Sequence, residues 1–325
     1  MAIPAPQPSS LEFERLNRAY NSVFVADQLS VGLVVPIERY ASSAIPTMRD
    51  HIERVQLAET LGFSAVWLRD VPFNVPSFGD AGQMFDPFVY LGALAATTDN
   101  IALGVSSIIL PLRHPAHVAK AAASADVLSN GRLLLGIASG DRVQEYPALD
   151  IEFDSRGARF REAYEYIRRM AESTPQFRNA YGDVDFGMDL LPKPVATRLP
   201  LLVTGSSQQS ADWIAHHADG WMTYPRPAQV QARMIERYRA DAGHSKPVME
   251  PLYIDLVENP GASPQPIHLG LRLGIDALRD YLESRQAIGV NHIALNLRFN
   301  QADIENTLKT LAAEILPQFT NRKPQ

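Results

Sequence analysis

"LSNGRLLLGI" (Leu128–Ile137) decides the fold, because it joins the end of a helix to the start of a strand. An amphipathic segment stops at Leu128, Gly131 follows, and a run of leucines begins. Glycine adopts the left-handed conformation that ends a helix without the steric penalty of a Cβ atom. We therefore interpret the stretch as a joint between a helix and a buried strand.

The same joint recurs three more times along the chain. It is found in Glu59–Leu68, His216–Tyr224 and Gln286–Asn296, around Gly62, Gly220 and Gly289. Four joints of this kind predict helices that alternate with the strands of a parallel sheet.

The remaining segments bring the number of predicted strands to eight. These strands lie near residues 30, 64, 101, 132, 200, 220, 248 and 292. Helices are predicted at 48–61, 87–97, 115–128, 156–171, from 207, at 275–287 and at 302–315. Eight βα units with right-handed crossovers predict an α/β fold of the closed TIM-type (β/α)8 barrel class. An open, doubly wound sheet is the alternative.

Three segments do not fit a minimal barrel, although the 325 residues are expected to form one domain. They are an N-terminal extension at 1–28, an irregular or hairpin insertion at 173–198, and a proline-rich loop at 257–271. Because barrel chemistry lies at the carboxyl ends of the strands, the loop at 257–271 is expected to border the active site as a lid.

The composition excludes several classes of function. Hydrophobic residues make up 46% and charged residues 20%, which is typical of a soluble globular protein. The net charge of −6 and the lack of a basic stripe argue against a nucleic-acid partner. No segment resembles a signal peptide or a membrane helix, so a cytoplasmic protein is expected. There is no cysteine and no HExxH motif, and no metal site is predicted.

Polar residues close most of the predicted strands, at the expected mouth of the barrel. They are Asp70, Ser106, Ser107, Ser139, Gly140, Asp141, Gly205, Ser206, Ser207, Tyr224 and Asn296. A mouth rich in hydroxyl groups and glycine suits a polar cofactor better than a pair of catalytic carboxylates.

"TGSSQQSADWIA" (Thr204–Ala215) has the order strand, glycine, serines, helix. The unpaired N–H groups at the start of a helix attract phosphate. Ser206, Ser207 and Ser210 would add hydroxyl donors, and Gly205 would let a ligand approach the backbone. The alternative is an ordinary serine cap of the helix. Arg142, after the fourth strand, either pairs with a phosphate or forms a surface pair with a neighbouring carboxylate.

Two serines, Ser106 and Ser107, interrupt the apolar strand in "IALGVSSIILPLRHP" (Ile101–Pro115). A buried hydroxyl group destabilises the fold unless it has a hydrogen-bond partner. The pair therefore either bonds to neighbouring backbone or serves a ligand.

Taken together, these residues resemble the bacterial luciferase-like family of flavin-dependent monooxygenases. The resemblance rests on Ala58–Pro72, Asp86–Asp141 and Thr204–Trp221, in this order and spacing. It implies a TIM-type barrel with an insertion region that binds reduced FMN, or in one branch the deazaflavin F420, at its mouth. It also implies homodimers.

The resemblance assigns roles to particular residues. A non-prolyl cis peptide is implied at Ser106–Ser107, as a shelf under the flavin ring. The phosphate-binding turn of the family matches Ser206, Ser207 and Ser210, and its ring-contacting segment matches Ala138, Ser139 and Gly140.

The chain also departs from luciferase itself. The catalytic histidine of luciferase lies in a Glu-His-His run after the second strand, where this chain has Asp70-Val71-Pro72. The Cys-Arg pair of luciferase is replaced by Ala138-Ser139, so the phosphate contact of that arginine would fall to Arg142, Arg113 or neither. Light emission is therefore not implied.

The leading hypothesis is a flavin-dependent monooxygenase that receives reduced FMN from a separate flavin reductase and acts on a small organic molecule. The alternatives are an F420-dependent hydride-transfer enzyme, a flavin-binding protein without catalysis, and a barrel lyase or hydrolase without flavin. Asp70, His114, Arg142 and Tyr146 are the candidates for contact with the ring or the substrate, and none is assigned an acid or base role.

Overall fold

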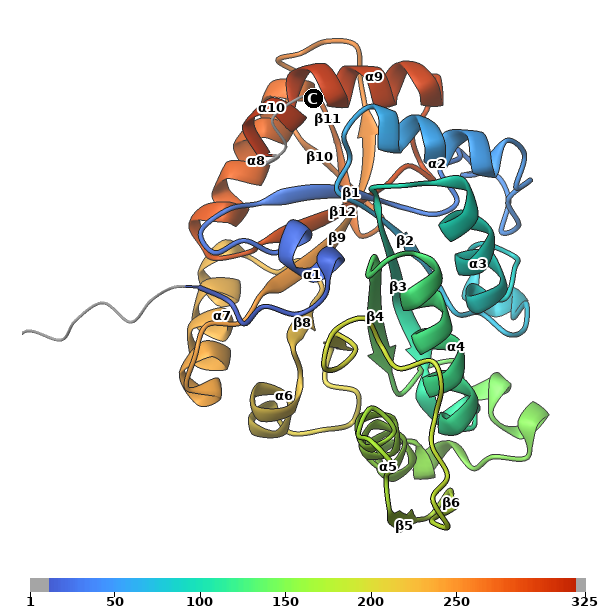
Figure 1. Ribbon diagram of the computed structural model, residues 1–325. Coiled ribbons are helices and arrows are strands. Elements are labelled where there is room, and N and C mark those ends of the chain that lie inside the picture. The colour runs from blue at the N-terminus through green and yellow to red at the C-terminus, as the bar shows by residue number, and fades with distance from the viewer. Residues whose placement is uncertain (1–11, 320–325) are drawn as a thin grey trace, which may run out of the picture.

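Eight parallel strands close into a barrel in the computed structural model, which describes residues 12–319 (Figure 1). Going round the barrel, each strand pairs in parallel with the next, and the pairing of β8 with β9 completes the ring. The strands are β1 (Ser30–Val34), β2 (Ala65–Leu68), β3 (Ala102–Ile109), β4 (Leu133–Ala138), β7 (Leu201–Thr204), β8 (Gly220–Met222), β9 (Val248–Leu256) and β12 (His292–Asn296). The predicted TIM-type barrel is confirmed.

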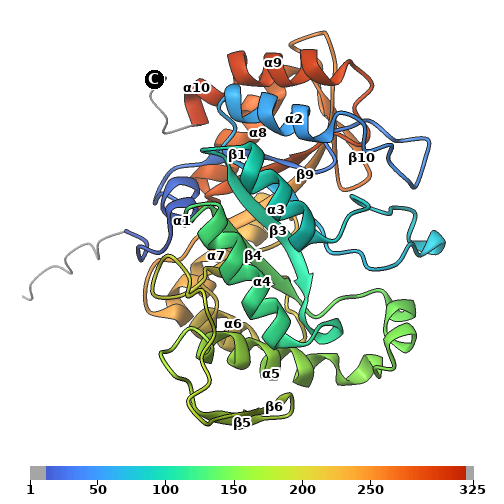
Figure 2. The ribbon, with the colours of Figure 1, turned by 45° about the vertical axis from the view of Figure 1, so that its right-hand side comes forward.

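Helices cover the outside of the barrel (Figures 1 and 2). They are α2 (His51–Thr60), α3 (Pro87–Thr97), α4 (Pro115–Leu128), α5 (Arg156–Arg169), α6 (Ala211–His217), α7 (Ala228–Ala242), α8 (Ile275–Ala287), α9 (Ile304–Glu314) and α10 (Leu316–Phe319). Short 3-10 turns lie at Pro76–Phe78, Leu110–Leu112, Val143–Glu145, Pro147–Leu149 and Phe153–Ser155. The sequence placed most of these helices to within a few residues, but it gave no range for α7.

Three of the four predicted joints have the expected conformation. Gly62, Gly131 and Gly289 have φ values of 93°, 76° and 93°. The prediction for Gly220 is wrong, because this residue is the first of β8 and α6 ends instead at Ala218 in an extended conformation.

The inside of the barrel is filled at its amino end by large side chains. The Trp67 indole N–H donates to His292 Nε2 at 2.8 Å, and His292 Nδ1 lies 2.7 Å from the Ser30 hydroxyl. A Cβ atom at Gly104 would lie 2.2 Å from the Trp67 ring, so only glycine leaves room there. Helix α1 (Arg18–Val23) packs below this layer, so the barrel is closed at this end and open only at the other.

The buried His292 makes the stability of the protein depend on pH. Burial lowers the pKa of its imidazole to about 3, whereas the unfolded chain binds that proton near pH 6.5. Between these values the unfolded state binds more protons, so stability falls as the pH decreases, by about 1.4 kcal/mol per pH unit. We expect the free energy of unfolding of His292→Gln, measured with urea at pH 7, 6 and 5, to lack the decrease with falling pH that His292 causes. An unchanged difference between variant and wild type across this range would contradict the assignment.

The additional segments contain two hairpins. Strands β5 (Phe177–Asn179) and β6 (Gly182–Val184) lie in the 173–198 insertion, beyond α5 and away from the barrel (Figure 2). Strands β10 (Gln265–Ile267) and β11 (Gly270–Leu273) form the second hairpin, and β11 pairs with the outer half of β9. The predicted N-terminal extension lies partly outside the described residues, and its described part contains α1. Within residues 12–319 no helix has the length and apolar character needed to cross a bilayer.

Candidate functional site at the barrel mouth

Two adjoining cavities occupy the carboxyl end of the barrel. The first, here called the chamber, has a volume of about 430 Å³ and lies over the strands β8, β9 and β12. The second, here called the groove, has a volume of about 370 Å³ and lies over β3, β4 and β7. The residues that line both are Arg69, Phe78, Ser106, Thr204 and Tyr224. One molecule can therefore extend from the groove into the chamber.

The polar residues that close the predicted strands all line one or both cavities. Tyr224 and Ser106 line both, Asn296 lines the chamber, and the rest line the groove. Because the strands are parallel and form one closed ring, their carboxyl ends meet at one place. The sequence pattern was therefore sufficient to locate the mouth of the barrel.

Ser106 and Ser107 form a kinked shelf between the two cavities. The peptide bond that joins them is cis, as the resemblance implied, and the pairing of β3 with β4 shifts register between Val105 and Ile108. The Ser106 hydroxyl lies 3.4 Å from the Leu68 carbonyl oxygen, and the Ser107 hydroxyl bonds to the Thr204 hydroxyl. Both hydroxyl groups thus have partners.

The turn after β7 lines the far end of the groove. Gly205, Ser207 and Gln208 have φ values of 57°, 46° and 60°. The Ser207 hydroxyl donates to the Thr204 carbonyl at 2.7 Å, which fixes the turn, while Ser206 is exposed in the groove. Ser210 lies outside the lining of both cavities, because its hydroxyl accepts from the Trp213 N–H and caps α6. The helix therefore starts at Ala211 rather than at 207.

The segment after β4 forms the other wall of the groove. Ala138, Ser139, Gly140, Arg142 and Glu145 all line it. Arg142 Nη2 donates to the Asp80 carbonyl at 3.1 Å, but Arg142 Nη1 and Glu145 Oε1 are buried with no hydrogen-bond partner among residues 12–319. These two atoms are 3.9 Å apart. Burial raises the pKa of Glu145 to about 7, and the nearby Arg142 opposes that rise.

Of the four candidates for contact with the ring or the substrate, Asp70 and Arg142 line the groove. Asp70 borders the groove, but the Arg113 guanidinium binds both of its oxygens, at 2.9 and 2.7 Å. Asp70 therefore forms a structural ion pair with Arg113 at the rim of the groove.

The other two candidates, His114 and Tyr146, lie outside the lining of both cavities. His114 Nδ1 accepts from the Ala116 N–H at the start of α4, and Nε2 faces the Tyr181 carbonyl in the β5–β6 hairpin. Tyr146 is fully buried, and its hydroxyl donates to the Ser139 carbonyl. Both side chains instead make hydrogen bonds to backbone groups outside the cavities.

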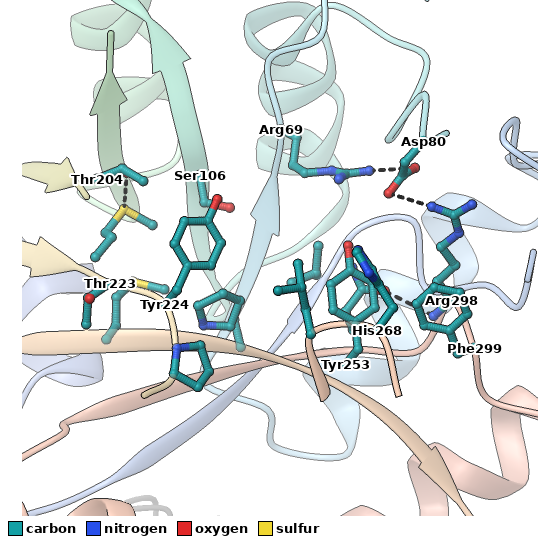
Figure 3. Close-up of a pocket in the computed structure, with 18 of the residues that line it drawn as sticks. Arg69, Asp80, Ser106, Thr204, Thr223, Tyr224, Tyr253, His268, Arg298 and Phe299 are labelled. Carbon is teal, nitrogen blue, oxygen red and sulfur yellow. Dashed lines mark hydrogen bonds and ion pairs between the residues drawn. The ribbon is translucent and has the colours of Figure 1, made fainter. Parts of the chain in front are cut away.

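The sequence did not indicate Asp80, which organises one wall of the chamber (Figure 3). One carboxylate oxygen lies 3.0 Å from Arg69 Nη2 and the other 3.0 Å from Arg298 Nη1, while the Tyr40 hydroxyl donates at 3.2 Å. Burial alone would raise the pKa of Asp80, but the charge of Arg69 and the hydrogen bonds to the carboxylate outweigh it and lower that pKa. This network ties the loop after β2 to the strand ends of β2 and β12.

An aromatic group completes the chamber opposite the shelf. Tyr253, His268 and Phe299 line the chamber, and their ring centroids are separated by 5.3 to 6.1 Å (Figure 3). His268 lies in the two-residue turn between β10 and β11, within the segment predicted as a lid. The alternation in "PIHLGLRL" could have indicated this hairpin, but nothing in the sequence places its turn in the cavity.

A closed parallel barrel with its polar residues gathered in one mouth is the arrangement of barrel enzymes that act on small molecules. The family model described as luciferase-like monooxygenase matches residues 29–254. The chain belongs to the luciferase-like monooxygenase family, a family of flavin- or F420-dependent oxidoreductases.

Two curated relatives illustrate the range of this family. The uncharacterized protein Rv0953c of Mycobacterium tuberculosis is 31% identical over 209 residues, which cover 58% of this chain and 73% of that protein. The F420-dependent hydroxymycolic acid dehydrogenase of the same species is 29% identical over 217 residues, which cover 65% of this chain and 57% of the dehydrogenase.

Solved structures with the same fold include enzymes of both cofactor types. Monooxygenase RslO1 from Streptomyces bottropensis has a TM-score of 0.73 at 22% identity, covering 90% of this chain and all of its own. An F420-dependent secondary alcohol dehydrogenase has a TM-score of 0.73 at 18% identity, with the same coverage. The FMN-bound oxygenating constituent of 3,6-diketocamphane monooxygenase from Pseudomonas putida has a TM-score of 0.71 at 16% identity, covering 90% and 99%. At these identities the similarity establishes the fold alone.

Proposed function

We propose that this protein is an oxidoreductase that holds reduced FMN across the two cavities and uses it to oxygenate a small organic substrate. The observation that carries this proposal is the continuity of the groove and the chamber at the cis Ser106–Ser107 shelf. The phosphate of the cofactor would bind the turn at Ser206 and Ser207. The ring would rest on the shelf, beside Ala138, Ser139 and Gly140.

The unpaired atoms of the groove fit a cofactor of this kind. Arg142 Nη1 is a buried donor and Glu145 Oε1 a buried acceptor, and neither atom has a hydrogen-bond partner in residues 12–319. Leaving such groups unpaired costs about 1–3 kcal/mol each, so a bound group that carries both an acceptor and a donor would stabilise this wall. FMN and F420 both present alternating C=O and N–H groups on the ring and hydroxyl groups on the side chain.

The chemistry would be divided between cofactor and protein. Reduced FMN supplies two electrons and activates dioxygen when it is bound. The chain holds the cofactor at the groove, while Phe78, Met222 and Met249 make the chamber apolar and limit the access of water. We expect a separate flavin reductase to supply the reduced cofactor and the enzyme to be a homodimer, as in the family.

A second candidate is an F420-dependent hydride-transfer enzyme. It is favoured by the 29% identity to the F420-dependent hydroxymycolic acid dehydrogenase. Both candidates use the same shelf and turn, and they differ in whether dioxygen is consumed.

Anaerobic titration with reduced FMN and with reduced F420, followed by fluorescence, tests the proposal. Tighter binding of reduced FMN, with oxygen consumption in the presence of substrate, is the expected result. Tighter binding of F420 would select the second candidate. Binding of one cofactor without turnover of any substrate in a broad panel would indicate a flavin-binding protein without catalysis. Binding of neither would overturn both oxidoreductase assignments.

Ser206→Asp is expected to weaken the binding of FMN by about 100-fold or more, because the new carboxylate would repel the phosphate at close range. Ser210→Asp is the matched control. It adds the same charge four residues away, outside the groove, and aspartate caps a helix as well as serine does. Dissociation constants from the titration above measure both effects. Equal losses in the two variants would argue against the turn at Ser206 as the phosphate site.

A further inference from the structure

His268 is an imidazole presented to the chamber by a rigid hairpin. Among residues 12–319 it is the one histidine that lines either cavity. In the described part of the chain its ring contacts Tyr253 and Phe299, and neither ring nitrogen has a hydrogen-bond partner. The side chain is exposed, so a molecule in the chamber can reach it.

The position of His268 is fixed by the backbone around it. The Tyr253 N–H donates to the Leu269 carbonyl at 3.3 Å, and β11 continues in register along the outer half of β9. A Cβ atom at Gly270 would lie 1.8 Å from the Tyr253 carbonyl oxygen, so the hairpin touches β9 directly. The imidazole also packs edge-on against the rings of Tyr253 and Phe299, each at 6.1 Å. It is therefore held on a strand pair rather than on a loose loop.

The other ionisable groups of the chamber are poorly suited to move a proton near neutral pH. Arg69 and Arg298 are both paired with Asp80, and guanidinium groups do not release protons in proteins. Burial raises the pKa of the Tyr253 and Tyr224 hydroxyls above their ordinary value. Imidazole is the side chain that ordinarily changes its charge between pH 5 and 8.

The rest of the chamber indicates the class of molecule that His268 would meet. Most of the surface of the chamber is apolar, and nine of its twenty lining residues are apolar: Val34, Phe78, Met222, Pro225, Met249, Pro251, Leu269, Ala294 and Phe299. Apolar pockets with a few convergent polar groups bind largely hydrocarbon molecules and orient them by a single polar function. Tyr253 and Asn296, which are paired neighbours on β9 and β12, also line the chamber and can hydrogen-bond an oxygen.

We propose that His268 exchanges a proton with the oxygen of a substrate that has a hydroxyl or carbonyl group on a mainly apolar body. In the forward direction the O–H bond breaks, its electron pair stays on the oxygen, and the proton goes to the lone pair of an imidazole nitrogen. In the reverse direction the imidazolium returns the proton to the oxygen. This inference rests on the proposed function, because it takes the chamber to be the place where the substrate binds.

The experiment uses 4-nitrophenol as the probe, since it has a hydroxyl group on an apolar ring and its phenolate is yellow. Binding to the full-length protein is measured by equilibrium dialysis, and ionisation of the bound probe by its visible absorbance. His268→Asn removes the proton acceptor and keeps a polar side chain. His244→Asn is the matched control, because His244 follows α7 and lines neither cavity. Thermal melting confirms that both variants are folded.

At one pH unit below the pKa of the probe, about a tenth of the free probe is phenolate. We expect wild type and His244→Asn to raise that fraction at least about threefold in the bound probe, through pairing with the imidazolium. His268→Asn should bind the probe but not raise the fraction to this extent. The charges of Arg69, Arg298 and Asp80 are present in every variant, so their effect cancels in the comparison.

Equal ionisation in His268→Asn and wild type would overturn the inference, and so would failure of the wild type to bind the probe. The cofactor titration is a separate measurement. If the protein binds neither FMN nor F420 but shows the histidine-dependent colour change, the proposed function is wrong and the assignment of His268 as a proton acceptor stands.

Discussion

Replacing Asp80 with asparagine is expected to lower the free energy of unfolding by about 3–5 kcal/mol, because it leaves Arg69 and Arg298 without their shared counter-charge in a buried site. Both ion pairs are 3.0 Å long, and the side chains involved are at least four-fifths buried. The loop that carries Phe78 would also lose its anchor at the mouth, so binding of any ligand in the chamber should weaken together with stability.

Urea unfolding of Asp80→Asn and of a control, Asp50→Asn, checks this prediction. The Asp50–Arg54 pair is 3.6 Å long and its carboxylate is 69% exposed, so losing it should cost less than about 1 kcal/mol. The pKa of Asp80 is lowered in the folded protein, and the stability that this provides is present above its unfolded value and lost as the pH falls through the folded value. Similar losses in the free energy of unfolding for the two variants would show that the Asp80 network contributes little to stability.

Replacing Arg285 with leucine is expected to lower stability by a similar amount, about 3–5 kcal/mol at pH 8, because Glu250 would remain buried without a partner. Glu250 is fully buried, and its carboxylate lies 3.3 Å from Arg285 Nε between β9 and α8. Arg285 Nη2 also donates to the Arg226 carbonyl at 2.7 Å, and that contact would be lost as well.

The effect of Arg285→Leu should depend on pH in a definite direction. Burial raises the pKa of Glu250 to about 7, so the folded protein binds this proton more tightly than the unfolded chain does. The loss of stability should therefore be smaller at pH 5, where the carboxyl group is protonated, than at pH 8. The double variant Glu250→Leu/Arg285→Leu should recover most of the stability, since apolar residues of similar volume often replace a buried ion pair without cost. A double variant no more stable than the single one would contradict this account.

The sequence predicted the barrel and the location of its mouth because both depend on short-range patterns. Helix ends, glycine joints and apolar strands are local, and a closed ring of parallel strands brings the strand ends together whatever the loops do. Ser106, Ser139 and Ser206 could therefore be placed at one site before the structure was known.

The sequence is less informative where long-range contacts decide which side chains reach the cavities. Ser210 looks like its neighbours in sequence, but the turn after Gly205 directs it to the helix cap. Tyr146 follows the same strand end as Arg142, yet the chain between them folds so that one side chain reaches the groove and the other is buried behind it.

Asp80 and His268 were missed for a related reason. Each is in a loop whose shape is set by a partner far away in the chain, Arg298 for Asp80 and Tyr253 for His268. No periodicity in the sequence carries that information.

Strand β9 serves two parts of the protein at once. Residues 249–253 pair with β12 inside the barrel, and residues 253–256 pair with β11 of the hairpin above the rim. The hairpin is attached by main-chain pairing, which is indifferent to the side chains at its turn. On the proposed function, new residues in place of His268 and Leu269 would change which substrates fit the chamber and leave the strand pairing unchanged, so this turn is a suitable place for engineering.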